Sequence, residues 1–331
     1  MLRIRDLTVS FGIPPVLLHA VRGVDLEVGN GEILGLVGES GSGKSLTCLS
    51  IMRLLGPNSV LKGRIEFKGQ DLLQLDEPGM TRMRGREIAM IFQDAMGSLN
   101  PVQTIGKQIR EALKRDAAPA AGAASNGRRS KTEEAIRLLG EVGIPEPSQR
   151  LREYPHQLSG GMNQRALIAM MLAGNPDLLI ADEPTTALDV TIQAQILRLL
   201  RDLRDQRGMS IILVTHDLGV VAETCDRVAV MYCGRVVETG TVGEVFKAPR
   251  HPYTRGLLNS RPRIDREVKA LQPIEGVVPS LSAMPSGCAF QPRCPRASEQ
   301  CGRAQPDFEL DAIGHGYMCF HPLTNSAERA G

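Results

Sequence analysis

Hydrophobic and polar residues alternate in the N-terminal part of the chain. The stretches "RIRDLTVSF" (3–11) and "VDLEV" (24–28) have the period of two that is typical of half-buried strands. The stretch "GRIEFKGQDL" (63–72) predicts a further strand and a turn, and "RVAVMYCGRVVETG" (227–240) predicts a closing hairpin.

Other runs are apolar along their whole length and predict buried strands: "ILGLV" (33–37), "IAMIF" (88–92), "LLIA" (178–181) and "SIILV" (210–214). Between the last two runs, apolar residues recur with a helical period at Ile192, Ile196, Leu199 and Leu203, and Gly208 is expected to end this helix. Strands that alternate with helices predict an α/β fold with a mostly parallel sheet.

The region from about residue 100 to 157 has a helical character. Within it, "DAAPAAGAASNG" (116–127) consists of small residues and predicts a flexible loop. Ser130 and Glu133 follow with the spacing of a capping box, which predicts the start of a helix. From about residue 246 the chain is first helical and then rich in Pro, Gly and Cys.

Composition narrows the class of protein. The chain has 331 residues, enough for about two domains, and 42% of them are hydrophobic. Its 39 basic and 37 acidic residues give no strong field, so no nucleic-acid partner is expected. The N-terminus lacks the apolar core of a signal peptide, and no apolar run has the length of a membrane helix. We therefore expect the chain in the cytosol or on its membrane face, where stable disulfides are disfavoured.

The segment "GESGSGKS" (38–45) fits the phosphate-binding loop G-x-x-x-x-G-K-[ST] and lies between a predicted strand and a predicted helix. Lys44 offers a cation, and the Ser45 hydroxyl is suited to Mg²⁺. The loop residues expected to surround the phosphates are Gly38, Ser40, Gly41 and Gly43.

Two carboxylates end the predicted strand "LLIADEP" (178–184). Asp182 is a candidate metal ligand, and Glu183 is placed to polarise an attacking water. The alternative interpretation of these two residues is a solvated acidic turn. The phosphate loop in the same predicted sheet disfavours this alternative. Gln93 and His216 also follow predicted strands, and each has either a structural role or a role near the metal, the water or the γ-phosphate.

The segment "LSGGMNQR" (158–165) places a serine and two glycines before an amphipathic helix. Ser159 is expected to cap this helix, and Ser159, Gly160 and Gly161 can offer N–H groups to a nucleotide, including one bound by a partner subunit. Asp189 is expected to cap the next helix and to lie at the nucleotide. Phe11 either stacks on adenine or packs in the core.

These segments, together with "TALD" (186–189) and "VTHD" (214–217), resemble in their order the nucleotide-binding subunit of an ABC transporter. The resemblance covers residues 1 to about 245. The segments "HPYTRGLL" (251–258), "IEGVVPSL" (274–281) and "PSGCAFQPRCP" (285–295) resemble the C-terminal extension of dipeptide, oligopeptide and nickel importer ATPases, and the chain is most similar to their D-type subunit.

The resemblance implies a P-loop NTPase fold with a RecA-like core, an antiparallel β subdomain and a helical subdomain at about 96–172. It divides the chain into an ATPase domain (1–245) and a small irregular extension (246–331). It further implies a head-to-tail dimer with a second ATP-binding subunit, expected to be a different chain, at the cytoplasmic face of the plasma membrane.

In this family, closure of the dimer around ATP moves two polytopic permeases, here through residues 99–101, and an extracytoplasmic solute-binding protein delivers the peptide. The resemblance places Mg²⁺ at Ser45, Gln93 and Asp182, with Glu183 as general base oriented by His216. The alternative is a soluble ABC-type ATPase that acts on DNA, ribosomes or cluster assembly. A third interpretation, a non-hydrolysing regulatory cassette, is disfavoured by the intact motifs.

Four of the seven cysteines lie near the C-terminus: Cys288, Cys294, Cys301 and Cys319. Their spacing lacks the tight C-x₂₋₄-C pairs of most zinc sites. Four thiolates on proline-rich loops are suited to an iron–sulfur cluster. The resemblance also points to a [4Fe–4S] cluster, expected to help this tail fold. Zinc and free structural thiols are the alternatives. The other three, Cys48, Cys225 and Cys233, are expected to be buried small hydrophobic residues.

Overall fold

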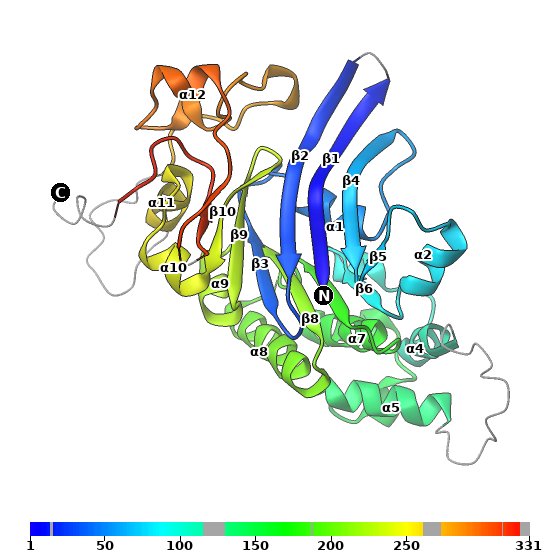
Figure 1. The fold of residues 1–331 in the computed structure, drawn as a ribbon. Helices are drawn as coiled ribbons and strands as arrows, with labels where there is room; N and C mark the ends of the chain where they lie inside the picture. Colours follow the sequence, from blue (N-terminus) through cyan, green and yellow to red (C-terminus); the bar gives the residue numbers. More distant parts are fainter. Residues whose placement is uncertain (14–15, 115–129, 187, 261–272, 313, 325–331) are drawn as a thin grey trace. The chain divides into compact units, whose positions relative to one another are not determined.

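The computed structural model describes residues 1–13, 16–114, 130–186, 188–260, 273–312 and 314–324 (Figure 1). The predicted flexible segment 116–127 lies outside the described residues. The chain forms two compact units, one made of Met1–Val28, Leu34–Leu73 and Thr215–Gly331, and the other of Gly29–Ile33 and Gln74–Val214.

The first unit contains an antiparallel sheet with the order β2-β1-β4-β5. The predicted alternation is confirmed in β1, where Leu2 and Ile4 are buried and Arg3 and Arg5 are exposed. At Asp6 the φ angle is 46° and the register shifts against both neighbouring strands, so the inward face resumes one residue later than strict alternation predicts. The strands are β1 (Leu2–Ile13), β2 (Val16–Val28), β4 (Ser59–Phe67) and β5 (Gln70–Asp71).

A second set of strands in this unit has the order β11-β12-β10-β9-β3. Strand β3 pairs parallel to β9, and β9 and β10 form the predicted antiparallel hairpin. Two short strands from the C-terminal region extend this hairpin: β12 pairs with β10, and β11 pairs with β12. The bounds are β3 (Ile33–Val37), β9 (Arg227–Tyr232), β10 (Arg235–Thr241), β11 (Glu309–Leu310) and β12 (Gly316–Tyr317).

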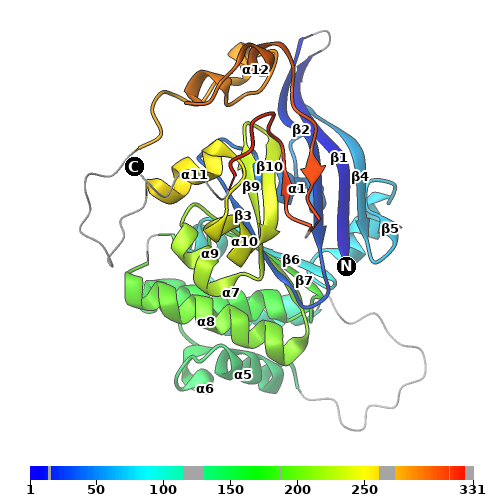
Figure 2. The ribbon, with the colours of Figure 1, turned by 60° about the vertical axis from the view of Figure 1, so that its left-hand side comes forward.

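The helices of the first unit are short, and most of them follow β9 and β10 in the chain (Figures 1 and 2). They are α1 (Lys44–Ile51), α9 (Leu218–Thr224), α10 (Val242–Lys247), α11 (Pro252–Asn259) and α12 (Glu299–Arg303), with single 3₁₀ turns η2 (Leu281–Ala283) and η3 (Gln291–Arg293).

The second unit contains three parallel strands with the order β8-β7-β6. All of their residues are buried, which explains the uninterrupted apolar runs in the sequence. The strands are β6 (Ile88–Ile91), β7 (Leu178–Asp182) and β8 (Ser210–Thr215). Helix α7 (Gly160–Leu172) packs on β6 and contacts four further helices: α3 (Ala95–Ser98), α4 (Ile105–Lys114), α5 (Lys131–Glu141) and α8 (Val190–Arg207).

Helix ends in the second unit follow the predicted signals. Ser130 and Glu133 form a capping box at the start of α5 (Lys131–Glu141), and Gly208 ends α8 (Val190–Arg207) with a φ angle of 67°. Arg207 ties these helices together through a bidentate ion pair with Glu141, with N–O distances of 2.6 and 2.8 Å. The other helical segments are α2 (Glu77–Met83), α3 (Ala95–Ser98), α4 (Ile105–Lys114), α6 (Pro147–Arg150) and the 3₁₀ turn η1 (Pro155–Gln157). Across the described residues of both units, every helix is too short or too polar to cross a membrane.

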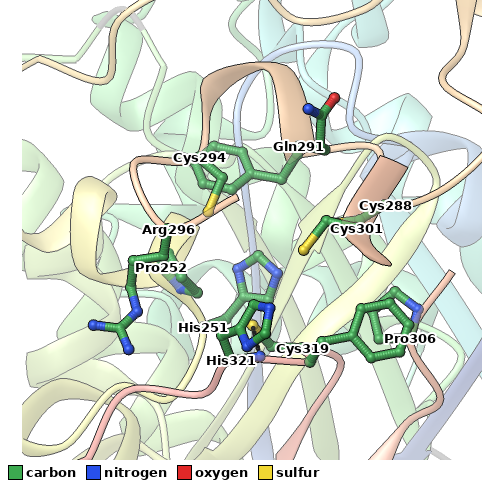
Figure 3. Close-up of a pocket in the computed structure, with 12 residues that line it drawn as sticks. His251, Pro252, Cys288, Gln291, Cys294, Arg296, Cys301, Pro306, Cys319 and His321 are labelled. Carbon is green, nitrogen blue, oxygen red and sulfur yellow. Dashed lines mark hydrogen bonds between the residues drawn. The ribbon is translucent and has the colours of Figure 1, made fainter. Parts of the chain in front are cut away.

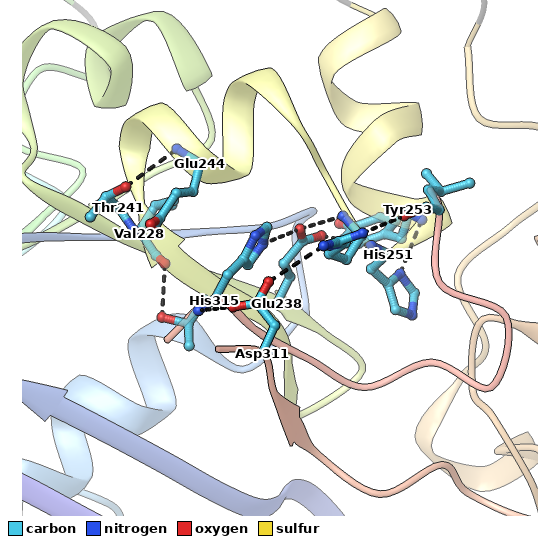
Figure 4. Close-up of polar contacts among 11 residues, drawn as sticks. Val228, Glu238, Thr241, Glu244, His251, Tyr253, Asp311 and His315 are labelled. Carbon is cyan, nitrogen blue, oxygen red and sulfur yellow. Dashed lines mark hydrogen bonds and ion pairs between the residues drawn. The ribbon is translucent and has the colours of Figure 1, made fainter. Parts of the chain in front are cut away.

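A buried carboxylate organises the C-terminal part of the first unit (Figure 4). Glu238 accepts the backbone N–H groups of Arg250 at 2.6 Å and His251 at 2.9 Å, and its carboxylate lies 2.7 Å from Nε2 of His315. His251 in turn caps helix α11, because its Nδ1 accepts the N–H of Tyr253 at 3.0 Å. Burial lowers the pKa of His251 to about 4, so the ring is neutral at pH 7 and free to accept this bond.

Candidate nucleotide-binding site

The loop between β3 and α1 has the backbone geometry of a cradle. Gly38 and Gly43 have φ angles of 152° and 103°, which residues with a side chain rarely adopt. A Cβ atom on Gly38 would lie 2.2 Å from the carbonyl oxygen of Met231, so this position excludes any side chain. The loop is anchored to the β9–β10 turn, where the Gly234 N–H donates to the Ser42 carbonyl at 2.8 Å.

Lys44 is the first residue of α1, and its side chain folds back over this loop. Its Nζ donates to the carbonyl oxygens of Gly38 at 2.8 Å and Glu39 at 3.0 Å, and the residue is 7% exposed. Ser40 and Gly41 are exposed, while Ser45 is partly buried in the first turn of the helix. A helix N-terminus with an ammonium group beside it supplies the donors and the positive charge that a chain of phosphates requires.

The carboxyl end of β7 carries the two predicted acidic residues. Asp182 is 5% exposed, and Glu183 follows with a φ angle of 48°, a strained value for a residue other than glycine. The Glu183 carboxylate accepts from Nε2 of Gln93 at 3.1 Å and from the Thr186 hydroxyl at 3.0 Å. The structure therefore brings Gln93 and Glu183 together, and it fixes the direction of the carboxylate proposed from the sequence as a base.

The serine and the two glycines of residues 159–161 lie at the start of α7. Ser159 caps the helix as predicted, because its hydroxyl accepts the Met162 N–H at 3.3 Å. The two glycines differ in their surroundings. A Cβ atom on Gly161 would lie 2.7 Å from Cγ2 of Ile192, whereas one on Gly160 would find its nearest neighbour at 3.6 Å. Gly161 is thus required by the packing of α7 on α8, a constraint that the sequence did not reveal.

The other predicted site residues are distributed over both units. Asp189 caps α8 as expected, with its carboxylate accepting the Ile192 N–H at 2.9 Å, and it is exposed. Phe11, near the end of β1, is partly buried opposite Leu18 of β2. His216 follows β8 and is exposed. The roles of these residues toward a nucleotide stay predictions.

Three residues around the loop were missed in the sequence: Glu39, Tyr253 and Arg293. Glu39 occupies a position that the loop pattern leaves unspecified, and it contacts the other two through hydrogen bonds. Tyr253 lies in the segment "HPYTRGLL" and Arg293 in "PSGCAFQPRCP", so the resemblance of both segments to one C-terminal extension was the available signal.

Comparison with protein families decides the class of this chain. A family model described as ABC transporter matches residues 21–186, which is half of the chain. The chain belongs to the ABC transporter family. A second model, described as the C-terminal region of oligopeptide/dipeptide transporters, matches residues 237–301. The family predicted from the sequence is therefore confirmed.

The similarity to curated relatives extends over almost the whole chain. The dipeptide transport ATP-binding protein DppD of Escherichia coli (strain K12) is 47% identical over 328 residues, which are 98% of each protein. DppD of Bacillus subtilis (strain 168) is 49% identical over 322 residues, 97% of this chain and 94% of that protein. The oligopeptide transport ATP-binding protein AppD of B. subtilis is 47% identical over 332 residues, 100% of this chain and 99% of that protein.

Solved structures confirm the P-loop fold of an ABC ATPase. The dimeric structure of MJ0796, a bacterial ABC transporter cassette, has a TM-score of 0.63 and 29% identity, and it covers 73% of this chain and 99% of that chain. The structure of cbiO1 from Clostridium perfringens has a TM-score of 0.61 and 27% identity, and it covers 74% of this chain and 90% of that chain. The predicted fold class also included a separate cysteine-rich extension at the C-terminus. These structures give no specific support for that extension.

The predicted iron–sulfur cluster is wrong. The four C-terminal cysteines do line one cavity, together with His251 and His321 (Figure 3). The cavity has a volume of about 10 Å³, which is the room that one water needs and not the room of a four-iron cluster. Among the residues that the structure describes, no group of three or more His, Cys, Asp or Glu side chains could hold a metal ion. The zinc alternative also fails, because the described residues contain no group suited to hold a metal ion.

Three of these cysteines, Cys288, Cys294 and Cys319, are partly buried, and Cys301 is buried. Burial raises the pKa of Cys288 and Cys294, and raises that of Cys319 to about 11, so these three thiols are protonated at neutral pH. Cys288 and Cys294 pack against an apolar core that includes Tyr253 and Phe290. All seven cysteines lie in the described residues, and none forms a disulfide.

Proposed function

We propose that this chain is the ATP-hydrolysing subunit of an ABC transporter that takes up dipeptides or oligopeptides. The similarity to dipeptide and oligopeptide transport ATP-binding proteins carries this proposal, because the alignments, at 47–49% identity overall, span 97–100% of the chain and therefore include the C-terminal region. A soluble ABC-type ATPase acting on DNA, ribosomes or cluster assembly is not favoured by these relatives.

The phosphates of ATP bind the backbone cradle of residues 38–43 and the ammonium group of Lys44. The excluded Cβ at Gly38 and the buried lysine fit this role. Phe11 stacks on adenine. This chain offers Ser159, Gly160, Gly161 and Asp189 to the nucleotide that the second ATPase subunit binds. The corresponding residues of the second subunit contact the nucleotide bound by this chain.

Ser45, Gln93 and Asp182 are the residues that would hold the magnesium ion of the nucleotide. They supply hydroxyl, amide and carboxylate oxygens, which are the hard ligands that Mg²⁺ prefers. An ion held there would neutralise part of the phosphate charge. Glu183, directed by Gln93 and Thr186, accepts a proton from the attacking water, and His216 orients that base.

The proposed setting is a membrane complex. The chain pairs with a second ATP-binding subunit, expected to be a different chain, at the cytoplasmic face of the membrane. Two polytopic permeases receive the motion through residues 99–101, and an extracytoplasmic solute-binding protein delivers the peptide. Residues 1–245 form the ATPase domain in this proposal, with a helical subdomain at about 96–172, and residues 246–331 form the extension.

Reconstitution tests this function. The complex is purified from native membranes through a tag on this chain, inserted into lipid vesicles, and supplied with ATP, the solute-binding protein and a labelled dipeptide. We expect ATP-dependent uptake that is lost when the chain carries Lys44→Ala. A complex without polytopic membrane proteins, or equal uptake with Lys44→Ala, would contradict the proposal.

A further inference from the structure

Glu39, the second residue of the phosphate loop, is held at every polar atom. Its N–H donates to the Tyr253 hydroxyl at 2.9 Å. Its carbonyl oxygen accepts from the Ser42 N–H at 3.2 Å and from Nζ of Lys44 at 3.0 Å. Its carboxylate accepts both terminal nitrogens of Arg293, at 2.7 and 3.1 Å. The loop pattern G-x-x-x-x-G-K-[ST] leaves the residue at this position open, so the pattern alone does not imply these contacts.

Arg293 is built into the C-terminal region with all of its donors used. Besides the two bonds to Glu39, its Nε donates to the Glu275 carbonyl at 3.0 Å and Nη2 donates to the Ile274 carbonyl at 3.3 Å. Nη1 also donates to the Tyr232 hydroxyl at 3.3 Å. These five bonds match the five N–H donors of a guanidinium group, and the side chain is 4% exposed. A lysine cannot reproduce this planar set of contacts.

Tyr253 reaches the loop from a different segment. It is fully buried in α11, whose start is fixed by the cap of His251. Its ring contacts those of Tyr232 and Phe290, with centroid distances of 4.6 and 5.4 Å. Two segments, at 251–259 and 291–293, therefore converge on one residue of the loop. Both lie inside the match to the C-terminal region of oligopeptide/dipeptide transporters.

We infer that Arg293 is a positioning residue for ATP binding, and that the C-terminal region sets the shape and charge of the phosphate loop through Glu39. The inference rests on the proposed role of the loop as the ATP site. Glu39 places a carboxylate next to a cradle for phosphates, where an unbalanced negative charge repels the ligand. Arg293 balances this charge, and with Tyr253 it holds the backbone of the loop in its binding conformation.

The test is the affinity of the purified full-length chain for Mg²⁺ and a non-hydrolysable ATP analogue, measured by calorimetry. We expect Arg293→Gln to weaken binding by about tenfold. Adding Glu39→Gln to this variant removes the unbalanced charge and should return the affinity to within about threefold of the wild type. The matched control is Arg303→Gln, an exposed arginine of the same region that pairs with Glu299 and should bind like the wild type.

A structural role alone would lower the melting temperature of Arg293→Gln without this charge-dependent recovery. Wild-type affinity in a folded Arg293→Gln variant, or a double variant no better than the single one, would overturn the inference. If Arg293→Gln does not fold, the ATP affinity of Tyr253→Phe tests the inference instead. This variant removes one hydroxyl and should weaken binding about threefold, and unchanged affinity would overturn the inference. Failure of the wild type to bind the analogue would instead reject the proposed function.

Discussion

The phosphate loop of the first unit and the acidic strand end of the second unit are held in different ways. Around the loop, Glu39 is fixed by the buried side chains of Tyr253 and Arg293, which follow it by more than 200 residues in the chain. At the strand end, Glu183 is fixed by the nearby Thr186 and by Gln93, which is exposed. The loop is thus supported by a packed core, and Glu183, the proposed base, is supported by surface hydrogen bonds.

This difference suggests that the phosphate loop and Glu183 have different tasks. A cradle for phosphates has to keep one shape, because its N–H groups bind only when they converge. A base that acts on water has to change its partners during turnover, and exposed contacts permit this at small cost. Disturbing the first unit should therefore affect folding and ATP affinity, whereas disturbing Glu183 should affect the hydrolysis step.

The largest effect on stability is expected at Glu238. In the wild type the buried Glu238 carboxylate accepts two backbone N–H groups. Glutamine at this position carries no charge, and its N–H₂ group faces one of these donors and cannot accept from it. We expect Glu238→Gln to lower the free energy of unfolding by about 2–4 kcal/mol. Chemical denaturation followed by a probe in the first unit measures this loss.

The control for Glu238 is Glu299→Gln, since Glu299 is 84% exposed and pairs with Arg303 on the surface. This control should lie within about 0.5 kcal/mol of the wild type. If both variants have the same stability, the buried hydrogen bonds of Glu238 do not stabilise the C-terminal region.

A smaller effect is expected at the two neighbouring glycines of the second unit. Alanine improves helix propensity by up to about 1 kcal/mol at either position. At Gly161 this gain is outweighed, because the new methyl group meets a branched carbon of Ile192 at 2.7 Å. We expect Gly161→Ala to lose about 1–2 kcal/mol of stability and Gly160→Ala to lose none. Denaturation midpoints of the two variants provide the comparison.

A double variant identifies the cause. Gly161→Ala combined with Ile192→Ala should be more stable than the sum of the two single changes predicts, because the shortened side chain leaves room for the methyl group. Strict additivity would show that the clash with Ile192 is not the reason for the glycine.

The local features of this chain could be predicted from the sequence, because their causes are local. The apolar run at 178–181 identified a buried strand, and Ser130, Asp189 and Gly208 marked helix ends through their own side chains or backbone freedom. The phosphate loop was likewise visible as one short pattern, and its glycine conformations follow from it.

Long-range features were not predictable in this way. Nothing in the neighbourhood of Glu39 indicates a contact with Arg293, since the partner is selected by the packing of the whole C-terminal region. The cysteines illustrate the opposite error. Their clustering in the sequence correctly indicated proximity, but it carried no information on the size of the cavity or on the protonation of the thiols, and the cluster prediction failed there.

The different tasks inferred for the phosphate loop and for Glu183 are tested most directly by Glu183→Gln in the assembled complex. ATP binding and the rate of ATP hydrolysis are measured on the same preparation. We expect ATP binding and dimer closure to be retained while the hydrolysis rate falls by about 10²–10⁴, the usual contribution of a general base. Near-normal turnover in this variant, or loss of ATP binding with it, would show that Glu183 is not a base that acts only in the hydrolysis step.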